Sequence, residues 1–394
     1  MEKIINLGIP HVGELIFESI DTDGLIECLN ISQTWKVLAE NVLFKRWRER
    51  IFEACISGKV EVMKILLERL DYENNEWNVS RDDYGYTPYM VACVLGHENL
   101  VELFLEHYLD RNIDLNAKDN NRRTAFMAAC NEDHANIVKL LRGHADQTIE
   151  FNYRDNHGQS ALMLACNEGH KDIVQLLLEN SDGKIEINEG DDDGETALMK
   201  ACGEGHKDVV KLLLEHSDRI DLDEKSDGIT QKTALMKAVL FGHKDVVELL
   251  LDPSVNIDLN ARDEDGTTVF ILACMEGHKE IVKLFLNSSG RNIDLNAKDE
   301  NGWTGFMAAC NEGHANIVKL LLDHADRKIE FNERDSYGQT ALSIACRQGN
   351  KDIVKLLLKH SDRIDLNARH NYAKTAFMLA CSRGQKDVVE LLLD

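Results

Sequence analysis

Apolar and polar residues follow one order that returns along most of the chain. In residues 155–190, Leu162, Ala165 and Cys166 lie at positions i, i+3 and i+4, the spacing of one face of a short helix. Gly169 can end that helix because glycine adopts the left-handed conformation without steric strain. A second apolar stripe follows it. The pattern therefore predicts two short helices joined by a turn.

The same two-helix pattern returns with a period of 35 to 38 residues. One position near the end of each first helix marks the period: Cys55, Cys93, Cys130, Cys166, Cys202, Cys274, Cys310, Cys346 and Cys381, with Val239 in the remaining place. Two short helices cannot bury their apolar faces alone, because they enclose too little core. Stacked repeats can do so, and the period therefore predicts a solenoid stabilised by nearest-neighbour contacts.

The repeat resembles the ankyrin repeat. Residues 158–165 (GQSALMLA) stand where that family has G-x-T-P-L-H-x-A, Gly169 and His170 match its GH, and residues 173–178 are similar to its VVxLLL. The resemblance implies an all-α fold, an ankyrin-repeat solenoid of helix-turn-helix units joined by β-hairpin loops. It extends over residues 51–394, as one half-repeat followed by nine repeats, and it implies a protein partner.

Three residues depart from the pattern where a turn needs glycine. Arg122 and Ala373 replace the glycine of the turn before a first helix, and Asp133 replaces the glycine between two helices. If these residues keep a positive φ, each should cost about 1 kcal/mol, and Asp133 somewhat less. The chain stops at residues 393–394, within the second helix of a repeat, and we expect this end to fray or to be covered by another element.

Residues 1–50 do not follow the repeat. Their apolar residues predict three short helices, which are too few to form a stable core of their own. The order of residues resembles an F-box, in which a Leu-Pro pair opens the first helix and a V-C-x-x-W motif follows in the third. The matching positions are Ile9, Pro10, Leu15, Ile20, Leu25, Ile31, Trp35 and Trp47.

The F-box resemblance implies a second partner, the Skp-type adaptor of a cullin–RING ubiquitin ligase. In this interpretation the ankyrin groove holds the protein to be ubiquitinated, and the chain raises the local concentration of that substrate without catalysing the transfer. The alternative is a plain ankyrin scaffold whose N-terminal helices only cap the open face of the solenoid, a cap that repeat arrays need in any case.

Composition narrows the classes of partner and the location. The formal net charge of −24 disfavours nucleic acids and anionic membranes as partners. No secretion signal and no apolar run of about 18 residues is present, so we expect neither export nor membrane insertion. Because most cysteines occupy one helical position on separate layers of the stack, a reduced cytoplasmic or nuclear location is favoured over disulfides.

Cysteine and histidine recur four residues apart in several repeats, as in Cys166 and His170. Zinc needs about four converging ligands, but the glycine before each histidine breaks the helix, so the pair does not share one face. Val239 also replaces the cysteine of a repeat that keeps His243. We therefore expect no metal and no cofactor, and we expect each histidine to hydrogen-bond within its own helix–helix turn.

Catalysis is not expected, because no nucleophile elbow, phosphate-binding loop or metalloprotease motif occurs. The acidic run at residues 191–194 lacks the alternating ligands of a calcium loop and is interpreted as an exposed turn.

In ankyrin arrays the hairpin tips and first helices line a groove, and ligand choice depends on the residues that vary between repeats. Residues 111–182 and 291–362 are close copies at an offset of 180, and within them Arg122-Arg123 becomes Gly302-Trp303. Exposed Tyr, Trp and Arg are common contact residues. The groove contact candidates are Tyr84, Tyr86, Arg122, Arg123, His157, Trp303, Tyr337 and Tyr372.

An asparagine recurs in the loop after each second helix. These loops resemble substrates of the asparaginyl hydroxylase that also acts on hypoxia-inducible factor. The possible hydroxylation sites are Asn116, Asn152, Asn188, Asn260, Asn296, Asn332 and Asn367, while Asp223 replaces the asparagine in one repeat. Alternatively, the asparagine bridges backbone groups of the turn through its side chain, which alone would explain its recurrence.

Overall fold

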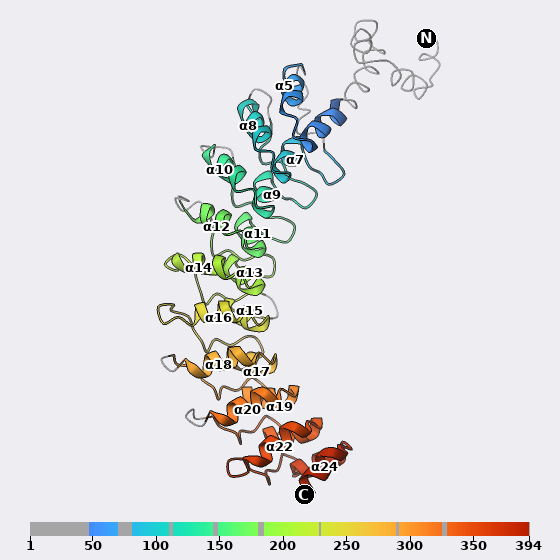
Figure 1. Ribbon diagram of the computed structural model, residues 1–394, viewed down its shortest axis with the longest axis vertical. Coiled ribbons are helices and arrows are strands. Elements are labelled where there is room, and N and C mark those ends of the chain that lie inside the picture. Colours follow the sequence, from blue (N-terminus) through green and yellow to red (C-terminus); the bar gives the residue numbers. More distant parts are fainter. Residues whose placement is uncertain are drawn as a thin grey trace, which may run out of the picture. The chain divides into compact units, whose positions relative to one another are not determined.

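The computed structural model describes residues 47–69, 81–109, 113–144, 149–179, 185–227, 230–288, 291–324 and 329–393 (Figure 1). The chain divides into two compact units, Met1–Asn156 and His157–Asp394. Of the F-box-like positions only Trp47 is described, at the start of a helix and half-buried. The other seven, from Ile9 to Trp35, lie outside the described residues.

Three helix pairs lie within the described residues of the first unit. Residues 47–56 are helical and precede α5 (Val60–Arg69), α7 (Pro88–Val94) precedes α8 (Glu98–His107), and α9 (Ala125–Asn131) precedes α10 (Ala135–Gly143). Consecutive pairs stack, since α7 packs against α9 and α8 packs against α10. The boundary predicted at residue 50 falls within the helix of residues 47–56.

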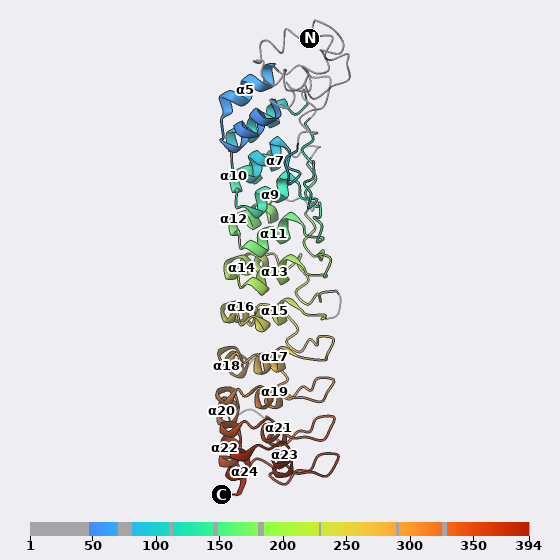
Figure 2. The same ribbon diagram turned by 90° about the vertical axis from the view of Figure 1, so that its right-hand side faces the viewer.

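The second unit contains seven helix pairs among its described residues. Its first helices are α11 (Ala161–Glu168), α13 (Ala197–Glu204), α15 (Ala234–Leu240), α17 (Val269–Met275), α19 (Gly305–Glu312), α21 (Ala341–Gln348) and α23 (Ala376–Ser382). Its second helices are α12 (Lys171–Leu178), α14 (Lys207–Glu215), α16 (Lys244–Leu250), α18 (Lys279–Asn287), α20 (Ala315–Asp323), α22 (Lys351–Lys359) and α24 (Lys386–Leu393). Figure 2 shows the second helices in one layer of this unit, the first helices beside them, and the loops beyond the first helices.

The two ends of a first helix are set by single side chains. In α13 the Thr196 hydroxyl accepts the N–H of Met199 at 3.4 Å and satisfies a donor that the helix leaves free. Gly205 ends the helix with φ of 77°, and a Cβ at this position would lie 2.4 Å from the His243 ring of the next repeat. Glycine is therefore required there both by its conformation and by the close approach of the neighbouring repeat.

The core consists of the apolar face of each first helix packed against its neighbours. The recurring cysteine is buried in eight of the nine repeats where it is described, and Val239 is fully buried in the same place. Burial raises the pKa of these thiols well above the ordinary value, so Cys166 and Cys202 act as small apolar side chains. The interpretation of this position as a packing position is consistent with the structure.

The loops that were predicted as β-hairpins contain turns but no strands among the described residues, apart from an isolated bridge between Arg369 and Thr375. The turn itself is present: the Asp119 N–H donates to the Arg123 carbonyl at 3.0 Å, and the Arg122 N–H donates to the Asp119 carbonyl at 3.0 Å. The prediction of hairpin strands was wrong, because the extended segments beside each turn are too short to form a ladder.

Positive φ angles occur where they were predicted, at Arg122 (63°), Asp133 (61°) and Ala373 (60°). A fourth, at Gln231 (44°), lies in a turn that is longer than the others and was not predicted. A residue with a Cβ is strained in this conformation, whereas glycine is not. The three substitutions for glycine therefore lower the stability of the stack.

We expect Arg122→Gly and Asp133→Gly each to raise the free energy of unfolding by about 1 kcal/mol, measured by urea denaturation. The reverse substitution Gly158→Ala serves as the control. It should lower stability, because φ there is 74° and a Cβ would lie 2.5 Å from the Asp192 carboxylate. Unchanged stability of both glycine variants would show that these turns relax without strain.

Candidate interaction surface

The turn before each first helix, here called the tip, is built around one side chain that is buried in most repeats. The Asp119 carboxylate is 7% exposed and accepts the N–H groups of Asn121 at 2.8 Å and Arg123 at 2.7 Å. Asp335 likewise accepts those of Tyr337 at 2.9 Å and Gln339 at 2.7 Å. The residues between the two donors are thereby held in one conformation, which presents their side chains outward.

Hydrogen bonds between neighbouring tips fix one tip per repeat in register. In the second unit, the N–H of Ser336 donates to the Asn301 carbonyl at 2.9 Å, and that of Asn371 donates to the Tyr337 carbonyl at 3.0 Å. In the first unit, the Asn120 N–H donates to the Tyr84 carbonyl at 3.0 Å. Each unit therefore carries a row of tips in which equivalent positions line up.

The contact candidates at the tips differ in how freely they face solvent. Tyr84 is 70% exposed, Tyr337 59% and Tyr372 78%, and Arg122 and His157 are exposed as well. These five can contact a partner without rearrangement. Tyr86, Arg123 and Trp303 are only half-buried and also contribute to the fold.

Trp303 and Arg123 occupy the same position in the two copies of the duplicated block, but they make different contacts. Trp303 packs on a cluster of Ile271, Ala297 and Ala308. The Arg123 Nε lies 3.2 Å from the Asp155 carboxylate, which is buried. Both side chains are therefore part of the fold as well as candidates for contact.

A buried charge network connects two repeats of the second unit, and the sequence analysis missed it. Lys200 on α13 lies 2.7 Å from the carboxylates of both Asp191 and Glu195, and Lys237 on α15 pairs with Glu195. All four side chains are at most 17% exposed. The signal in the sequence was a lysine within an otherwise apolar helix face, at the position that Leu164 occupies in α11.

Recurring histidines such as His206 and His243 bond the preceding repeat, not their own helix–helix turn. The His206 Nε2 donates to the Asn167 carbonyl at 2.8 Å, and the His243 Nε2 donates to the Gly203 carbonyl at 2.7 Å. Asn350 replaces the histidine in one repeat and donates to the Cys310 carbonyl at 2.8 Å. The expectation of a bond within the turn was wrong, because the histidine lies at the repeat interface.

The described part of the chain contains no group of three or more His, Cys, Asp or Glu side chains that could hold a metal ion. The cysteine of each predicted pair faces the core, whereas the histidine faces the carbonyl of the preceding repeat. The cysteine thus packs in the core, and the histidine hydrogen-bonds between repeats.

The recurring asparagine bridges the loops of successive repeats. The Asn188 Nδ2 donates to the Arg219 carbonyl at 2.9 Å, while its Oδ1 accepts the Asp221 N–H at 2.9 Å. Asp223, which replaces the asparagine in one repeat, accepts the Asp258 N–H at 2.8 Å. This role explains the recurrence without modification, and hydroxylation stays a prediction.

The hydroxylation candidates differ in exposure. Asn188, Asn332 and Asn367 are exposed, and Asn116, Asn152, Asn260 and Asn296 are half-buried.

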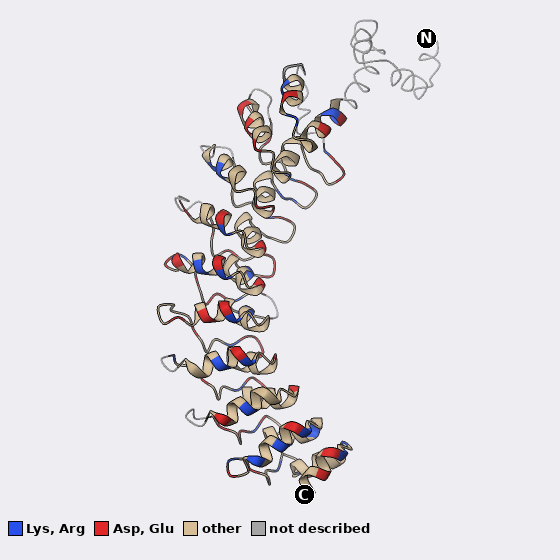
Figure 3. Cartoon of the chain, viewed as in Figure 1, with Lys and Arg blue, Asp and Glu red and all other residues tan. Residues whose placement is uncertain are grey.

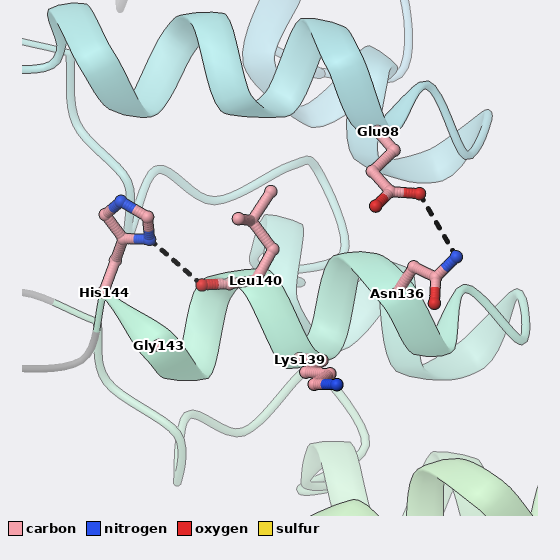
Figure 4. A pocket seen from close by; sticks show the side chains of 6 residues that line it. All are labelled: Glu98, Asn136, Lys139, Leu140, Gly143 and His144. Atoms are coloured by element: carbon pink, nitrogen blue, oxygen red, sulfur yellow. Dashed lines mark hydrogen bonds between the residues drawn. The ribbon is translucent and has the colours of Figure 1, made fainter.

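A hollow of about 420 Å³ lies between α8 and α10 of the first unit (Figure 4). Its lining side chains already bond one another or the backbone: the Asn136 Nδ2 donates to Glu98 at 3.2 Å, and the His144 Nδ1 donates to the Leu140 carbonyl at 3.1 Å. These polar side chains do not converge on a common point, since Lys139 points away from this network in Figure 4. The tips remain the stronger candidate surface.

Comparison with known families and proteins gives one consistent result. A family model described as "Ankyrin repeats (3 copies)" matches residues 41–119, 107–191, 182–263, 254–335 and 325–394. Ankyrin repeat domain-containing protein 63 from Homo sapiens is 34% identical over 89 residues, which are 23% of each chain. The Mus musculus protein of the same name is 33% identical over 89 residues, 23% of this chain and 22% of its own.

The match therefore spans less than a quarter of the length of these relatives. Within the described residues, no helix is both long and apolar enough to cross a membrane.

Proposed function

The chain belongs to the ankyrin-repeat family, whose members generally serve as non-catalytic scaffolds for protein–protein interaction, and we propose that it recruits substrates to an SCF-type ubiquitin ligase. Residues 1–50 dock the Skp-type adaptor, and the tips hold the protein to be ubiquitinated. The observation that carries this proposal is the F-box-like order of residues 1–50 directly before a repeat array with exposed aromatic tips.

Such a chain contributes no catalytic group of its own. It holds the substrate near the ubiquitin-conjugating enzyme and thereby raises the effective concentration of the reacting partners. The tips suit this task, because buried carboxylates and cross-repeat hydrogen bonds hold them in one conformation before a partner arrives. Preorganisation of this kind lowers the entropic cost of binding.

A second function, a plain scaffold with a helical cap, is favoured by a different observation. Residues 47–56 form one continuous helix that leads into α5, and the family match begins at residue 41. The last part of the F-box-like segment is thus also the first helix of the array. In this alternative, residues 1–50 only cover the open face of the first repeat.

Adaptor binding separates the two functions. We expect Leu15→Asp and Trp35→Asp each to abolish binding of the full chain to a recombinant Skp-type adaptor, because a charge in a packed apolar interface is strongly unfavourable. Binding is measured by pull-down and by calorimetry. Helical content and thermal unfolding of the repeats should stay unchanged.

The matched control is Tyr372→Ala, which alters a tip and should leave adaptor binding intact. If both charged variants bind the adaptor as the wild type does, the plain scaffold is the correct function.

A further inference from the structure

The first residue after the buried side chain of each tip, here called the leading tip position, has a structural task in several repeats. In the second unit, the Asn371 Nδ2 donates to the Ser336 carbonyl at 3.1 Å, and the Ser336 hydroxyl donates to the Asn301 carbonyl at 2.7 Å. In the first unit, the Asn120 Nδ2 donates to the Asp83 carbonyl at 3.1 Å. The side chain at this position therefore clamps one tip to the preceding one.

Four consecutive repeats of the second unit lack a side chain that can donate this hydrogen bond. Their leading tip positions are Asp192, Asp227, Glu264 and Glu300, all exposed. A carboxylate has no hydrogen to donate at neutral pH. Within the described part of the chain, none of the four carboxylates makes a hydrogen bond or an ion pair. Stability alone would favour asparagine or serine here, as in the repeats that follow.

Further acidic residues lie beside the four carboxylates, whereas the basic side chains of Lys225 and Arg262 on the same loops donate to backbone carbonyls of the next loop. Asp193 and Asp265 are exposed next to them on the same tips. Burial raises the pKa of Asp299, which lies beside Glu300, and the carboxylates of Asp265 and Asp263 raise it further. On the second helices, by contrast, acidic and basic residues lie next to one another (Figure 3).

Exposed aromatic side chains continue the same row. Tyr337 is 59% exposed and Tyr372 is 78% exposed on the two tips that follow Glu300. Large aromatic side chains at this exposure add nothing to the core and are frequent anchors in protein interfaces. The tip row of the second unit therefore has an acidic part and an adjoining aromatic part, in a register fixed by the backbone bonds between tips.

We propose that this row binds an extended polypeptide segment in which a run of lysine or arginine residues adjoins aromatic residues. Packed neighbouring helices lie about 10 Å apart, which corresponds to roughly three residues of extended chain. A basic residue at about every third position can therefore meet each acidic tip in turn. The inference rests on the proposed protein-binding function and names the chemistry of the partner.

The test uses the full chain and a fluorescent synthetic peptide that joins a run of spaced lysines to a pair of tryptophans. Affinity is measured by fluorescence polarisation at low and at high ionic strength. The decisive variant combines Asp192→Asn, Asp227→Asn, Glu264→Gln and Glu300→Gln. It should weaken peptide binding on the order of tenfold at low ionic strength, since each exposed pair contributes a few tenths of a kcal/mol.

This variant should not unfold the chain. Asparagine at two of the positions can restore the clamp that Asn371 makes, so the melting temperature should be equal or higher. The matched control neutralises four exposed acids on the second helices, with Asp172→Asn, Asp208→Asn, Asp245→Asn and Glu280→Gln, and makes the same change in net charge. It should leave peptide affinity within about twofold at physiological ionic strength, because these acids lie on the second helices and not on the tips, and salt screens interactions between separated exposed charges.

The aromatic part has its own test. Tyr337→Ala combined with Tyr372→Ala should weaken binding of the peptide with tryptophans and leave binding of a lysine-only peptide unchanged. Three results would overturn the inference: no binding by the wild type, equal loss in both charge variants, or equal binding of a peptide with glutamate in place of lysine. The adaptor experiment tests residues 1–50 and uses a tip variant only as its control, so adaptor docking stands or fails independently.

Discussion

Lys200→Ala is expected to lower the free energy of unfolding by about 3 kcal/mol, although lysine is usually a surface residue. The substitution removes the cation that lies 2.7 Å from both Asp191 and Glu195 and leaves these carboxylates largely buried. Lys237 still pairs with Glu195, but Asp191 is left without a cation. Urea denaturation of the full chain measures the loss. Lys211→Ala, which changes an exposed lysine of the same unit, should cost less than about 0.5 kcal/mol.

The chain offers a matched rescue for this variant. In the repeat of α21, the buried Asp335 accepts a hydrogen bond from the Gln339 Nε2 at 3.1 Å, and Ile344 takes the place of the lysine. Glu195→Gln combined with Lys200→Ile recreates that arrangement around Asp191, and Lys237→Leu is added because Lys237 would otherwise lose its carboxylate; Leu379 holds that place in α23. This triple variant should be clearly more stable than Lys200→Ala. If Lys200→Ala alone leaves the free energy of unfolding unchanged, water solvates the network, and the unpaired carboxylates do not lower stability.

The same network predicts a dependence of stability on pH. Burial raises the pKa of Glu195, but hydrogen bonds and attraction from Lys200 and Lys237 outweigh burial and hold it below the ordinary value of 4.5. The stabilisation from Glu195 is therefore present above that value and is lost as the pH falls through the lower folded pKa. Burial lowers the pKa of Lys200, but hydrogen bonds and attraction from Asp191 and Glu195 outweigh burial and raise this pKa above the ordinary value of 10.5. The stabilisation from Lys200 is therefore lost only as the pH rises through the raised pKa.

The helices and turns of a repeat could be predicted because they depend on residues that lie close together in the sequence. A short apolar stripe such as Leu162, Ala165 and Cys166 specifies a helix and its buried face, and a positive φ at Arg122 follows from the glycine that other repeats have there. These features depend on a few neighbouring residues, whose spacing is visible in the sequence. The family matches extend over the same repeats.

The features that were missed depend on how repeats stack. His206 bonds a carbonyl that lies 39 residues earlier, and Lys200 joins a network completed by Lys237 on the next first helix. Sequence spacing within one repeat contains no information about either partner. Tyr84, Tyr337 and Tyr372 are exposed, and their contact with a partner stays a prediction; the packing of Trp303 on its neighbours could not be read from one repeat.

Thiol labelling of the native chain is expected to separate one cysteine of the array from the others. Cys381 is exposed, whereas Cys274 and Cys310 are fully buried. Alkylation requires an accessible thiolate, and burial, together with the neighbouring Cys274 and Cys346, raises the pKa of the Cys310 thiol. Iodoacetamide should therefore modify Cys381 on the order of a thousandfold faster than Cys310, because the buried thiol reacts only after local opening that costs several kcal/mol. Peptide mass mapping assigns each site.

The ratio of the two labelling rates measures how stable the interfaces between neighbouring repeats are. A buried cysteine at 0% exposure, such as Cys310, becomes accessible only when α19 separates from α17 or α21, so its labelling rate reports the opening of those interfaces. Cys310→Val is the control for packing: it should change stability by less than about 1 kcal/mol, because Val239 fills the same place in another repeat. If Cys310 reacts as fast as Cys381 in the native chain, the stack opens freely at this point. The row of tips could not then hold a partner in fixed register, since its register depends on the same interfaces.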